Sequence, residues 1–310
     1  MPEGHTVHRV AALFREVLVG HTLLASSPQG RFREGAALIS GLELEHAEAK
    51  GKQLFLRFEA ERIVRVHLGI YGAWDVMTLE GDSVRAGSAQ TLSLGAPRAS
   101  RRRVGEREQW FDADEPFPPA PRGAVRLRLE TSEVVADLRG PTACEVLTAS
   151  EAAAVAERLG PDPQVDRGVR GQREFVRRTL GTTRPIGVVL MDQAVVSGIG
   201  NVYRAEILFR HKLDPYQPAS SLPSDVLVEI WRDWSGLLAD GVKTGVMMTR
   251  NDLDAKGRAR ALRVARERYF VYKREGLPCR VCGTHIQMAL MATRKLYFCP
   301  QCQILGKDGT

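Results

Sequence analysis

The sequence has 310 residues, of which 44% are hydrophobic, and a formal net charge of +7 with a pI near 9.3. No stretch approaches the ~18 consecutive apolar residues of a membrane-spanning helix. Residues 1–8 lack the basic and apolar runs of a secretory signal. We therefore expect a cytoplasmic protein with no membrane partner. The excess of basic over acidic residues suits a polyanionic partner and is equally consistent with a solvated basic surface.

The first half of the chain predicts a β-rich domain that begins with a helix. Apolar side chains recur at helical spacing over residues 6–19, and Gly20 suits a C-terminal cap. Short runs of β-branched, aromatic and alternating apolar residues, bounded by turn formers, then indicate strands. The expected strands are residues 53–58, 62–68, 124–129 and 133–138.

Residues 80–122 differ in composition from the strands on either side. They are rich in Gly, Ser, Pro and Arg, and they include the run Arg101-Arg102-Arg103. This composition predicts a long, mostly disordered insertion in a loop. The arginine run suits a contact with DNA and equally suits a solvated segment.

From about residue 148 the pattern becomes helical. Apolar stripes predict helices near residues 150–159, 172–180, 186–194, 200–210 and 224–240. Residues 247–268 are charged and rich in turn formers, so we expect them to be flexible or marginally helical. The predicted domains are a β-rich domain over residues 1–147, a helical domain over 148–275 and a cysteine module over 276–305.

Four of the five cysteines lie near the C-terminus in two C-x-x-C pairs. Cys279 and Cys282 are separated by sixteen residues from Cys299 and Cys302. Two such pairs complete a tetrahedron of thiolates around Zn²⁺ and leave no open position, so the spacing predicts one structural zinc ion. A redox-active pair is the minor alternative. The remaining cysteine, Cys144, is expected to be a buried small apolar residue.

The segment between the cysteine pairs predicts a β-hairpin. Arg294 and Lys295 fall near its tip. A basic tip on a hairpin fixed by zinc suits a phosphate contact, although a surface arginine is more commonly only solvated.

The chain begins Met1-Pro2-Glu3, and a small second residue permits removal of the methionine. The exposed α-amino group would have a pKa of about 7.7–8, well below the ~10.4 of lysine, so a useful fraction is neutral near pH 7. Such an amine can attack a sugar carbon and form a Schiff base, with Glu3 beside it as an acid or base. Lys52 precedes the strand over 53–58 and can face either a cleft or solvent. Alone, each feature is unspecific.

These features become specific because they occur in one order along the chain. Met-Pro-Glu-Gly is followed by Ala-Lys-Gly-Lys-Gln-Leu-Phe at 49–55, His-Leu-Gly-Ile-Tyr-Gly at 67–72, Ser-Gly-Ile-Gly-Asn-Val-Tyr-Arg-Ala-Glu-Ile-Leu at 197–208 and Phe-Val-Tyr-Lys-Arg-Glu-Gly-Leu-Pro-Cys at 270–279. The chain resembles the formamidopyrimidine-DNA glycosylase/endonuclease VIII family. Its start is similar to the endonuclease VIII branch, in an actinobacterial form. The likeness omits residues 80–122 and the stretch near 247–268.

The resemblance implies catalytic roles for four residues. Pro2 would be the Schiff-base nucleophile, and Glu3 the acid that protonates the sugar or the base. Lys52 would assist β-elimination and contact a phosphate. Arg294 would bind the phosphate beside the lesion and assist δ-elimination. Thr6 departs from the family, which usually has an acid there, and this bears on how the sugar ring is oriented.

The resemblance also implies DNA contacts. Asn201 matches the asparagine of a helix–two-turn–helix motif, whose helix N-terminus can present amides to a phosphate. Arg204, one turn further on, is expected to assist. Ile70 and Tyr71 match the wedge that fills the gap left by an everted nucleotide, although a place in the core would explain them equally well. His67 is expected to touch the DNA backbone.

The implied fold is α+β with two domains: an N-terminal β-sandwich with a helix, and a helical domain carrying the helix–two-turn–helix motif and a Cys₄ zinc-finger hairpin. The implied protein is a monomeric, bifunctional DNA glycosylase and abasic-site lyase of base excision repair, bound to damaged double-stranded DNA and so associated with a bacterial nucleoid. Oxidised pyrimidines are the expected substrates. The alternatives are an oxidised-purine glycosylase and a non-catalytic damage binder; a zinc-finger transcription factor lacks the repeated fingers it would need.

Overall fold

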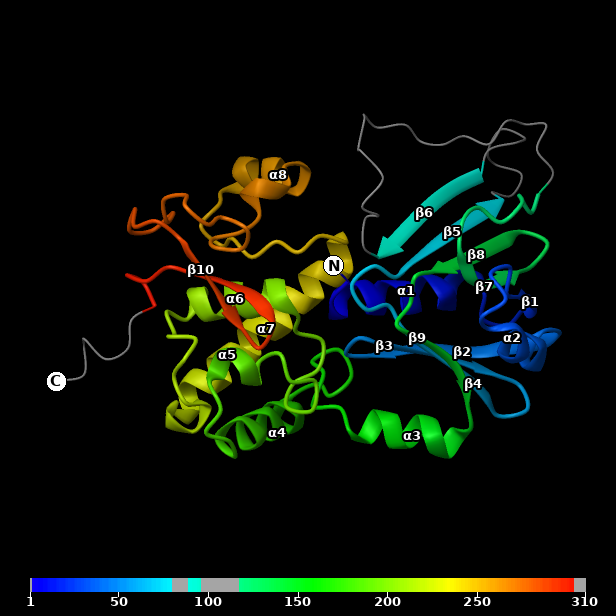
Figure 1. Cartoon of the computed structure of the whole chain (residues 1–310), viewed down its shortest axis with the longest axis horizontal. Coiled ribbons are helices and arrows are strands. Elements are labelled where there is room, and N and C mark those ends of the chain that lie inside the picture. The colour runs from blue at the N-terminus through cyan, green and yellow to red at the C-terminus, as the bar shows by residue number, and fades with distance from the viewer. Residues whose placement is uncertain (1, 80–88, 96–116, 304–310) are drawn as a thin grey trace. The chain divides into compact units, whose positions relative to one another are not determined.

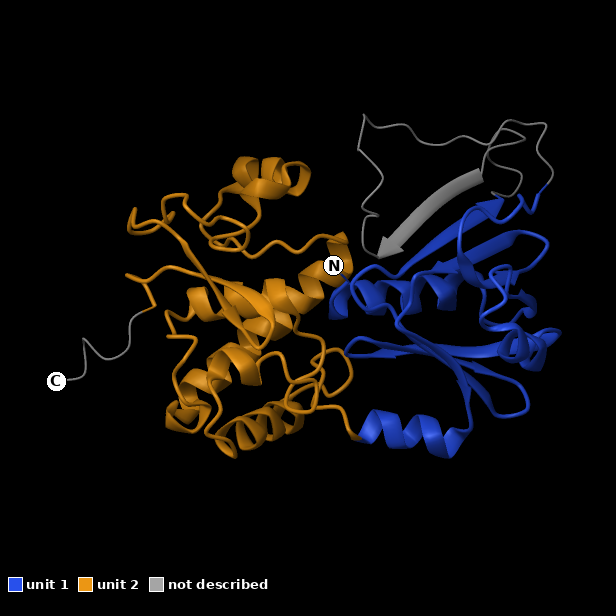
Figure 2. Cartoon of the chain, viewed as in Figure 1, with its two compact units in different colours: residues 1–157 blue, residues 158–310 orange. Residues whose placement is uncertain are grey.

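A computed structural model of the chain describes residues 2–79, 89–95 and 117–303 (Figure 1). It forms two compact units, unit 1 over residues 1–157 and unit 2 over residues 158–310 (Figure 2). No helix in the described part of the chain is long and apolar enough to cross a membrane.

Unit 1 is a nine-stranded antiparallel sheet with a helix against it. Its helices are α1 (Gly4–Val17), α2 (Arg33–Ile39) and α3 (Ala149–Glu157). Its strands are β1 (Thr22–Ser26), β2 (Leu42–Lys50), β3 (Gln53–Phe58), β4 (Arg62–His67), β5 (Ala73–Leu79), β6 (Ala89–Gly95), β7 (Val125–Glu130), β8 (Val134–Arg139) and β9 (Ala143–Leu147). The strand order is β6-β5-β8-β7-β1-β2-β3-β4-β9.

The sheet forms two layers on either side of α1 (Figure 1). Phe14 of α1 is fully buried, and its ring meets that of Trp74 on β5 edge to face, with centroids 4.9 Å apart. On the same core, α1 packs against β2 and β3, where Leu54 and Leu56 are buried. Cys144, expected to be buried, is half-buried and packs against this core, and desolvation raises the pKa of its thiol to about 12. The expected β-rich unit with a helix at its start is confirmed.

The expectation of a mostly disordered insertion over residues 80–122 is wrong for β6. This strand pairs with β5 along its whole length, from Ala73 opposite Gly95 to Leu79 opposite Ala89. Backbone pairing with a distant strand outweighs the Gly-, Ser- and Pro-rich composition of the segment around β6. The Arg101–Arg103 run lies outside the described residues.

The helix over 149–157 belongs to unit 1 and not to the helical half. Ala152 of α3 is buried with Phe55 and Ile63, on the outer side of β3 and β4. A helical pattern in the sequence does not reveal which domain supplies the surface that covers it.

Unit 2 is helical and ends in a two-stranded hairpin. Its elements are α4 (Val169–Leu180), α5 (Ile186–Val189), α6 (Asn201–Arg210), η1 (Ala219–Ser221), α7 (Ser224–Thr244), α8 (Ala255–Arg263), η2 (Ala265–Glu267), β10 (Gln287–Met291) and β11 (Arg294–Phe298). The core lies between α6 and α7, where the rings of Tyr203 and Trp234 are 4.8 Å apart.

One expected helix of unit 2 is shorter than predicted, and one further segment contains a short helix. The helix expected over residues 186–194 ends at Val189, because the Asp192 carboxylate accepts a hydrogen bond from the Ala194 amide and the Gln193 side-chain oxygen Oε1 accepts one from the Gly198 amide. Such side-chain bonds offer the backbone an alternative to the helix. Within 247–268, the segment expected to be flexible or marginally helical, the structure has the nine-residue helix α8 and the 3₁₀ turn η2.

Candidate functional site

The first group of predicted residues lies at the N-terminal end of α1. Pro2 and Glu3 are buried, and Glu3 is the N-cap residue, with extended backbone and its carbonyl accepting the Thr6 amide at 2.9 Å. The N-terminal end of a helix carries about half a positive charge. That field favours a carboxylate at Glu3 and disfavours a second positive charge beside it.

His5 and Thr6 complete this corner and are also buried. Burial, with the charge of Arg9 as the next cause, lowers the pKa of His5 to about 3, so its ring is neutral at physiological pH. The Thr6 hydroxyl lies 3.3 Å from the His5 Nε2 atom. The residue at the position of the usual family acid is therefore a neutral hydroxyl beside a neutral ring.

Lys52 and His67 form a second group at one end of the sheet. Lys52 occupies the turn between β2 and β3, and its neighbour Gln53 is paired with His67 on β4. The pKa of His67 is lowered first by burial and then by the positive charge of Lys52, which places the two side chains in electrostatic range. The His67 Nδ1 atom lies 2.6 Å from the Thr142 hydroxyl, so this partner orients the ring.

Ile70 and Tyr71 lie at the tip of the loop between β4 and β5. Both are exposed, Ile70 to 36% and Tyr71 to 71% of their surface, so the alternative that they belong to the core is wrong. The loop is tight: a Cβ atom on Gly72 would lie 2.2 Å from the Leu68 carbonyl oxygen. Apolar side chains held in water on a compact loop are suited to insertion into another surface.

In unit 2, Asn201 is the first residue of α6 and links it to the zinc hairpin. Its side-chain amide donates to the Lys295 carbonyl at 2.8 Å. Arg204 is fully buried and donates hydrogen bonds to the Asn201 side-chain oxygen Oδ1 and to the Gly187 backbone carbonyl. The DNA contact expected of Arg204 is therefore wrong for this arrangement, because no part of its guanidinium reaches solvent; it positions Asn201.

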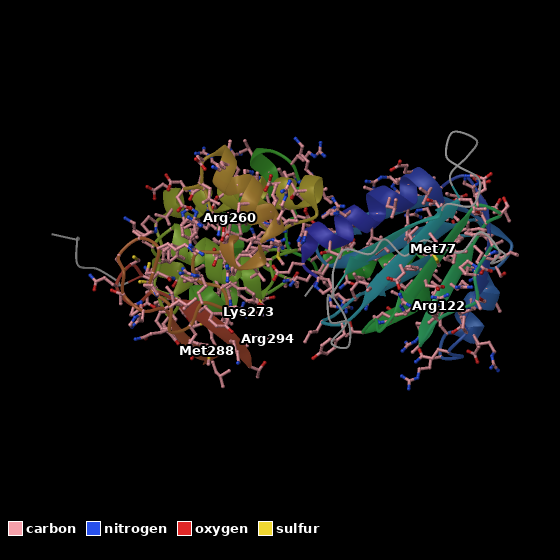
Figure 3. All side chains as sticks on the ribbon, turned by 90° about the horizontal axis from the view of Figure 1, so that it is seen from above. Met77, Arg122, Arg260, Lys273, Met288 and Arg294 are labelled. Atoms are coloured by element: carbon pink, nitrogen blue, oxygen red, sulfur yellow. The ribbon has the colours of Figure 1, made fainter. Side chains whose placement is uncertain are left out.

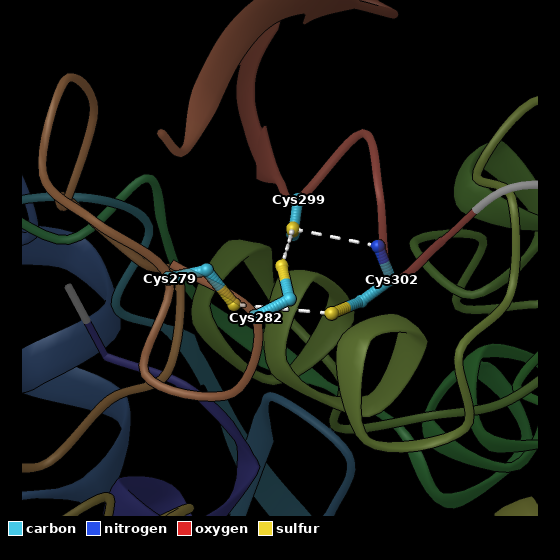
Figure 4. A group of neighbouring side chains, drawn as sticks. All are labelled: Cys279, Cys282, Cys299 and Cys302. Carbon is cyan, nitrogen blue, oxygen red and sulfur yellow. Dashed lines mark hydrogen bonds between the residues drawn. The ribbon is translucent and has the colours of Figure 1, made fainter. Parts of the chain in front are cut away.

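The four expected cysteines converge on one point (Figure 4). All four Sγ atoms lie within 4.8 Å of one another, with Cys279 and Cys302 3.9 Å apart and Cys282 and Cys299 3.4 Å apart. Zn–S bonds of about 2.3 Å in a tetrahedron place the sulfurs ~3.8 Å apart, so the set fits one zinc ion.

Backbone amides turn toward this site, as they do around a thiolate. The Val281 amide lies 3.4 Å from the Cys279 sulfur, and the Cys302 amide lies 3.4 Å from the Cys299 sulfur. Such bonds stabilise the negative charge that the sulfurs carry when they bind metal. The site is structural, since four protein ligands leave no position for a substrate.

Arg294 is exposed at the tip of the hairpin (Figure 3). It pairs with Met291 across a two-residue turn, Ala292 and Thr293, both with positive φ. This turn suits the twist of the two strands and fixes where Arg294 emerges. Its neighbour Lys295 supplies the carbonyl that Asn201 binds, so the hairpin tip and the start of α6 are held together.

Glu206 is a buried residue that sequence reasoning did not identify. Its carboxylate accepts the backbone amides of Phe270, Val271 and Tyr272, each at 2.8 Å, and the hydroxyl of Thr249. Burial raises its pKa, and these hydrogen bonds act in the opposite direction. The available signal was an acid in an otherwise apolar stretch of helix.

Comparison with known proteins assigns all three parts of the chain. The formamidopyrimidine-DNA glycosylase N-terminal domain matches residues 1–143, the formamidopyrimidine-DNA glycosylase H2TH domain matches residues 159–252, and a zinc finger found in FPG and IleRS matches residues 276–304. These are the parts to which the sequence motifs pointed.

The chain is 37% identical over 303 residues to endonuclease 8 1 of Mycobacterium tuberculosis, covering 98% of this chain and all of the relative. It is 28% identical to a formamidopyrimidine-DNA glycosylase of Thermus thermophilus, over 98% of each chain. In fold it is similar to Lactococcus lactis Fpg in complex with DNA containing an abasic site, with a TM-score of 0.69, 18% identity and coverage of 97% and 99%. The chain therefore belongs to the formamidopyrimidine-DNA glycosylase/endonuclease VIII family.

Proposed function

We propose that this chain removes oxidised pyrimidines from DNA and cuts the strand at the resulting abasic site through a Schiff base on Pro2. Family membership already makes it a DNA glycosylase of base excision repair with abasic-site lyase activity. The observation that supports the finer proposal most is the placement of Pro2 and Glu3 together at the N-terminal end of α1.

The first step is attack by the Pro2 amine. Removal of Met1 leaves a secondary amine, and an α-amino group with a pKa of about 7.7–8 is partly neutral at pH 7. The positive end of α1 opposes its protonation further. The neutral nitrogen attacks C1′ of the damaged nucleotide, Glu3 donates a proton to the sugar or the base, and the base leaves as the iminium forms.

The second step is elimination. The iminium makes the 2′ proton acidic; its removal, assisted by Lys52, expels the 3′ phosphate. A further elimination expels the 5′ phosphate and leaves a one-nucleotide gap with phosphate at both ends. Arg294 binds the phosphate beside the lesion in this scheme, because its exposed guanidinium offers a bidentate contact. No step uses a divalent cation.

Nucleotide eversion precedes this chemistry. Ile70 and Tyr71 fill the gap that the everted nucleotide leaves, which offsets part of an unstacking cost of a few kcal/mol. The amides at the start of α6 bind a phosphate. Asn201, held by Arg204, keeps that helix end aligned with the Arg294 hairpin.

The preference for pyrimidine lesions is supported by the higher identity to endonuclease 8 1, 37%, than to the Thermus formamidopyrimidine-DNA glycosylase, 28%, over nearly the same length. Parallel cleavage of duplexes with thymine glycol, dihydrouracil, 8-oxoguanine or a formamidopyrimidine separates the two preferences. Faster excision of the two purine lesions would reverse this part of the proposal.

The test of the mechanism is borohydride trapping on a duplex with one abasic site. Reduction should leave a covalent adduct that peptide mass spectrometry locates on Pro2. Pro2→Gly should abolish the adduct, and Glu3→Gln should abolish base removal. Glu16→Gln changes an exposed acid on the same helix and should behave as the parent. Absence of an adduct from zinc-loaded protein lacking Met1, with DNA binding intact, would indicate a damage-binding protein.

A further inference from the structure

Helix α8 lies in a segment that neither neighbouring family model covers. Residues 253–275 fall between the matches to the H2TH domain and the zinc finger. This segment contains eight Lys and Arg against three Asp and Glu, a net charge of +5 within a chain of net charge +7. Most of the excess positive charge is therefore concentrated in one short stretch.

The core does little to hold α8 in place. It has nine residues, fewer than the ~12–15 at which an isolated helix becomes marginally stable, and Ala261 is its one buried residue. Polar contacts support it instead. The Asp254 carboxylate caps its start by accepting the Gly257 amide at 2.7 Å, and Arg268 donates to the Ala261 carbonyl at 3.1 Å and the Leu262 carbonyl at 2.8 Å at its end.

On the side of α8 that faces the unit, Arg258 forms an ion pair with Asp240 of α7 at 2.6 Å. The opposite side carries Lys256, Arg260 and Arg263 at positions i, i+4 and i+7, which lie within about 60° of one another around a helix. All three are exposed, and Figure 3 shows Arg260 on this part of unit 2. Arg260 also contacts Glu267 at 2.9 Å and remains 67% exposed.

The three positive charges of this stripe repel one another and so destabilise α8. Like charges three and four residues apart destabilise a helix by about 0.2–0.5 kcal/mol per pair. A polyanion removes that repulsion. Lys256 and Arg263 are seven positions apart, about 10 Å along the helix axis, which is comparable to the rise of three base pairs along duplex DNA at ~3.4 Å each.

We propose that the α8 stripe, Lys256, Arg260 and Arg263, binds the phosphate backbone of duplex DNA. The contact is independent of base sequence and of damage. It adds to the phosphate contacts proposed at the hairpin tip and at the start of α6. The inference rests on the proposed function only for the identity of the polyanion.

The test is the salt dependence of binding to a short undamaged duplex, for which no catalysis is needed. Each phosphate contact contributes about 0.9 to the slope of log K against log salt. K256Q/R260Q/R263Q should lower the slope by about 2.7 between about 50 and 200 mM salt, and K256Q/R263Q, which keeps the Arg260–Glu267 pair, by about 1.8. Glutamine has a helix propensity close to those of Lys and Arg.

R31Q/R33Q/R57Q is the matched control, since it removes three exposed charges from unit 1. It should keep the parent slope. An unchanged slope in both α8 variants, or an equal fall in the control, overturns the proposal. Borohydride trapping tests the proposed function separately. The control R31Q/R33Q/R57Q should form the Pro2 adduct at the parent rate. If the parent forms no adduct, the proposed mechanism is wrong, whereas the salt dependence of the α8 variants can still be measured.

Discussion

Glu206→Gln is the change whose effect the structure defines most closely. One oxygen of the Glu206 carboxylate accepts hydrogen bonds from the backbone amides of Val271 and Tyr272. The other accepts hydrogen bonds from the backbone amide of Phe270 and the hydroxyl of Thr249. Glutamine keeps the shape but turns one oxygen into an NH₂ donor that faces other donors. The Thr249 hydroxyl can rotate and accept a hydrogen bond from this NH₂ group, whereas a backbone N–H can only donate. At least one buried amide therefore loses its acceptor.

The magnitude follows from these bonds. An orphaned buried amide costs about 1–3 kcal/mol, and two remaining bonds to a neutral acceptor lose about 1 kcal/mol each relative to a charged one. The neutral amide avoids the desolvation that raises the pKa of Glu206, which offsets part of this loss. We expect a net loss of about 3 kcal/mol from a total of about 5–15 kcal/mol.

The assay is urea unfolding of the zinc-loaded chain, followed by tryptophan fluorescence. With a slope of about 1–3 kcal/mol per molar urea, the midpoint should fall by about 1 M or more. Glu229→Gln, an exposed acid on α7, is the control and should shift stability by less than about 0.5 kcal/mol. Equal midpoints for the two variants would refute the reasoning that Glu206 anchors residues 270–272, the segment that leads into the zinc module.

Three other predictions concern the site itself. Burial keeps His5 neutral in the folded chain, while the unfolded chain binds a proton below about pH 6.5. Stability should therefore fall by about 1.4 kcal/mol per pH unit as pH drops from 6.5 toward 3, and His5→Gln should lessen this slope; parallel stability–pH curves would contradict it. Tyr71→Ala should leave the unfolding midpoint within about 0.5 kcal/mol, since Tyr71 is 71% exposed, but slow base excision from intact lesions, and parent-like excision rates would remove it from the wedge. Cys299→Ser should abolish stoichiometric zinc in metal analysis and weaken DNA binding; full zinc content would show that three thiolates suffice.

The sequence by itself determined the features that depend on neighbours in the chain. Two C-x-x-C pairs placed four sulfurs around one point, because a knuckle is a local turn and needs only the right spacing. The period of the apolar residues likewise predicted α1 and most helices of unit 2. The order of the family motifs also depends only on short stretches of chain.

Only the tertiary structure decided what is buried and what pairs at a distance. β6 forms because β5 offers it a backbone edge, and α3 joins unit 1 because Phe55 and Ile63 need cover. Arg204 looked like a DNA contact, yet the packing of α6 against α5 and the hairpin removes it from solvent and makes it a support for Asn201. A local pattern records the spacing of side chains along one element; the partner that covers each face comes from residues far away in the chain.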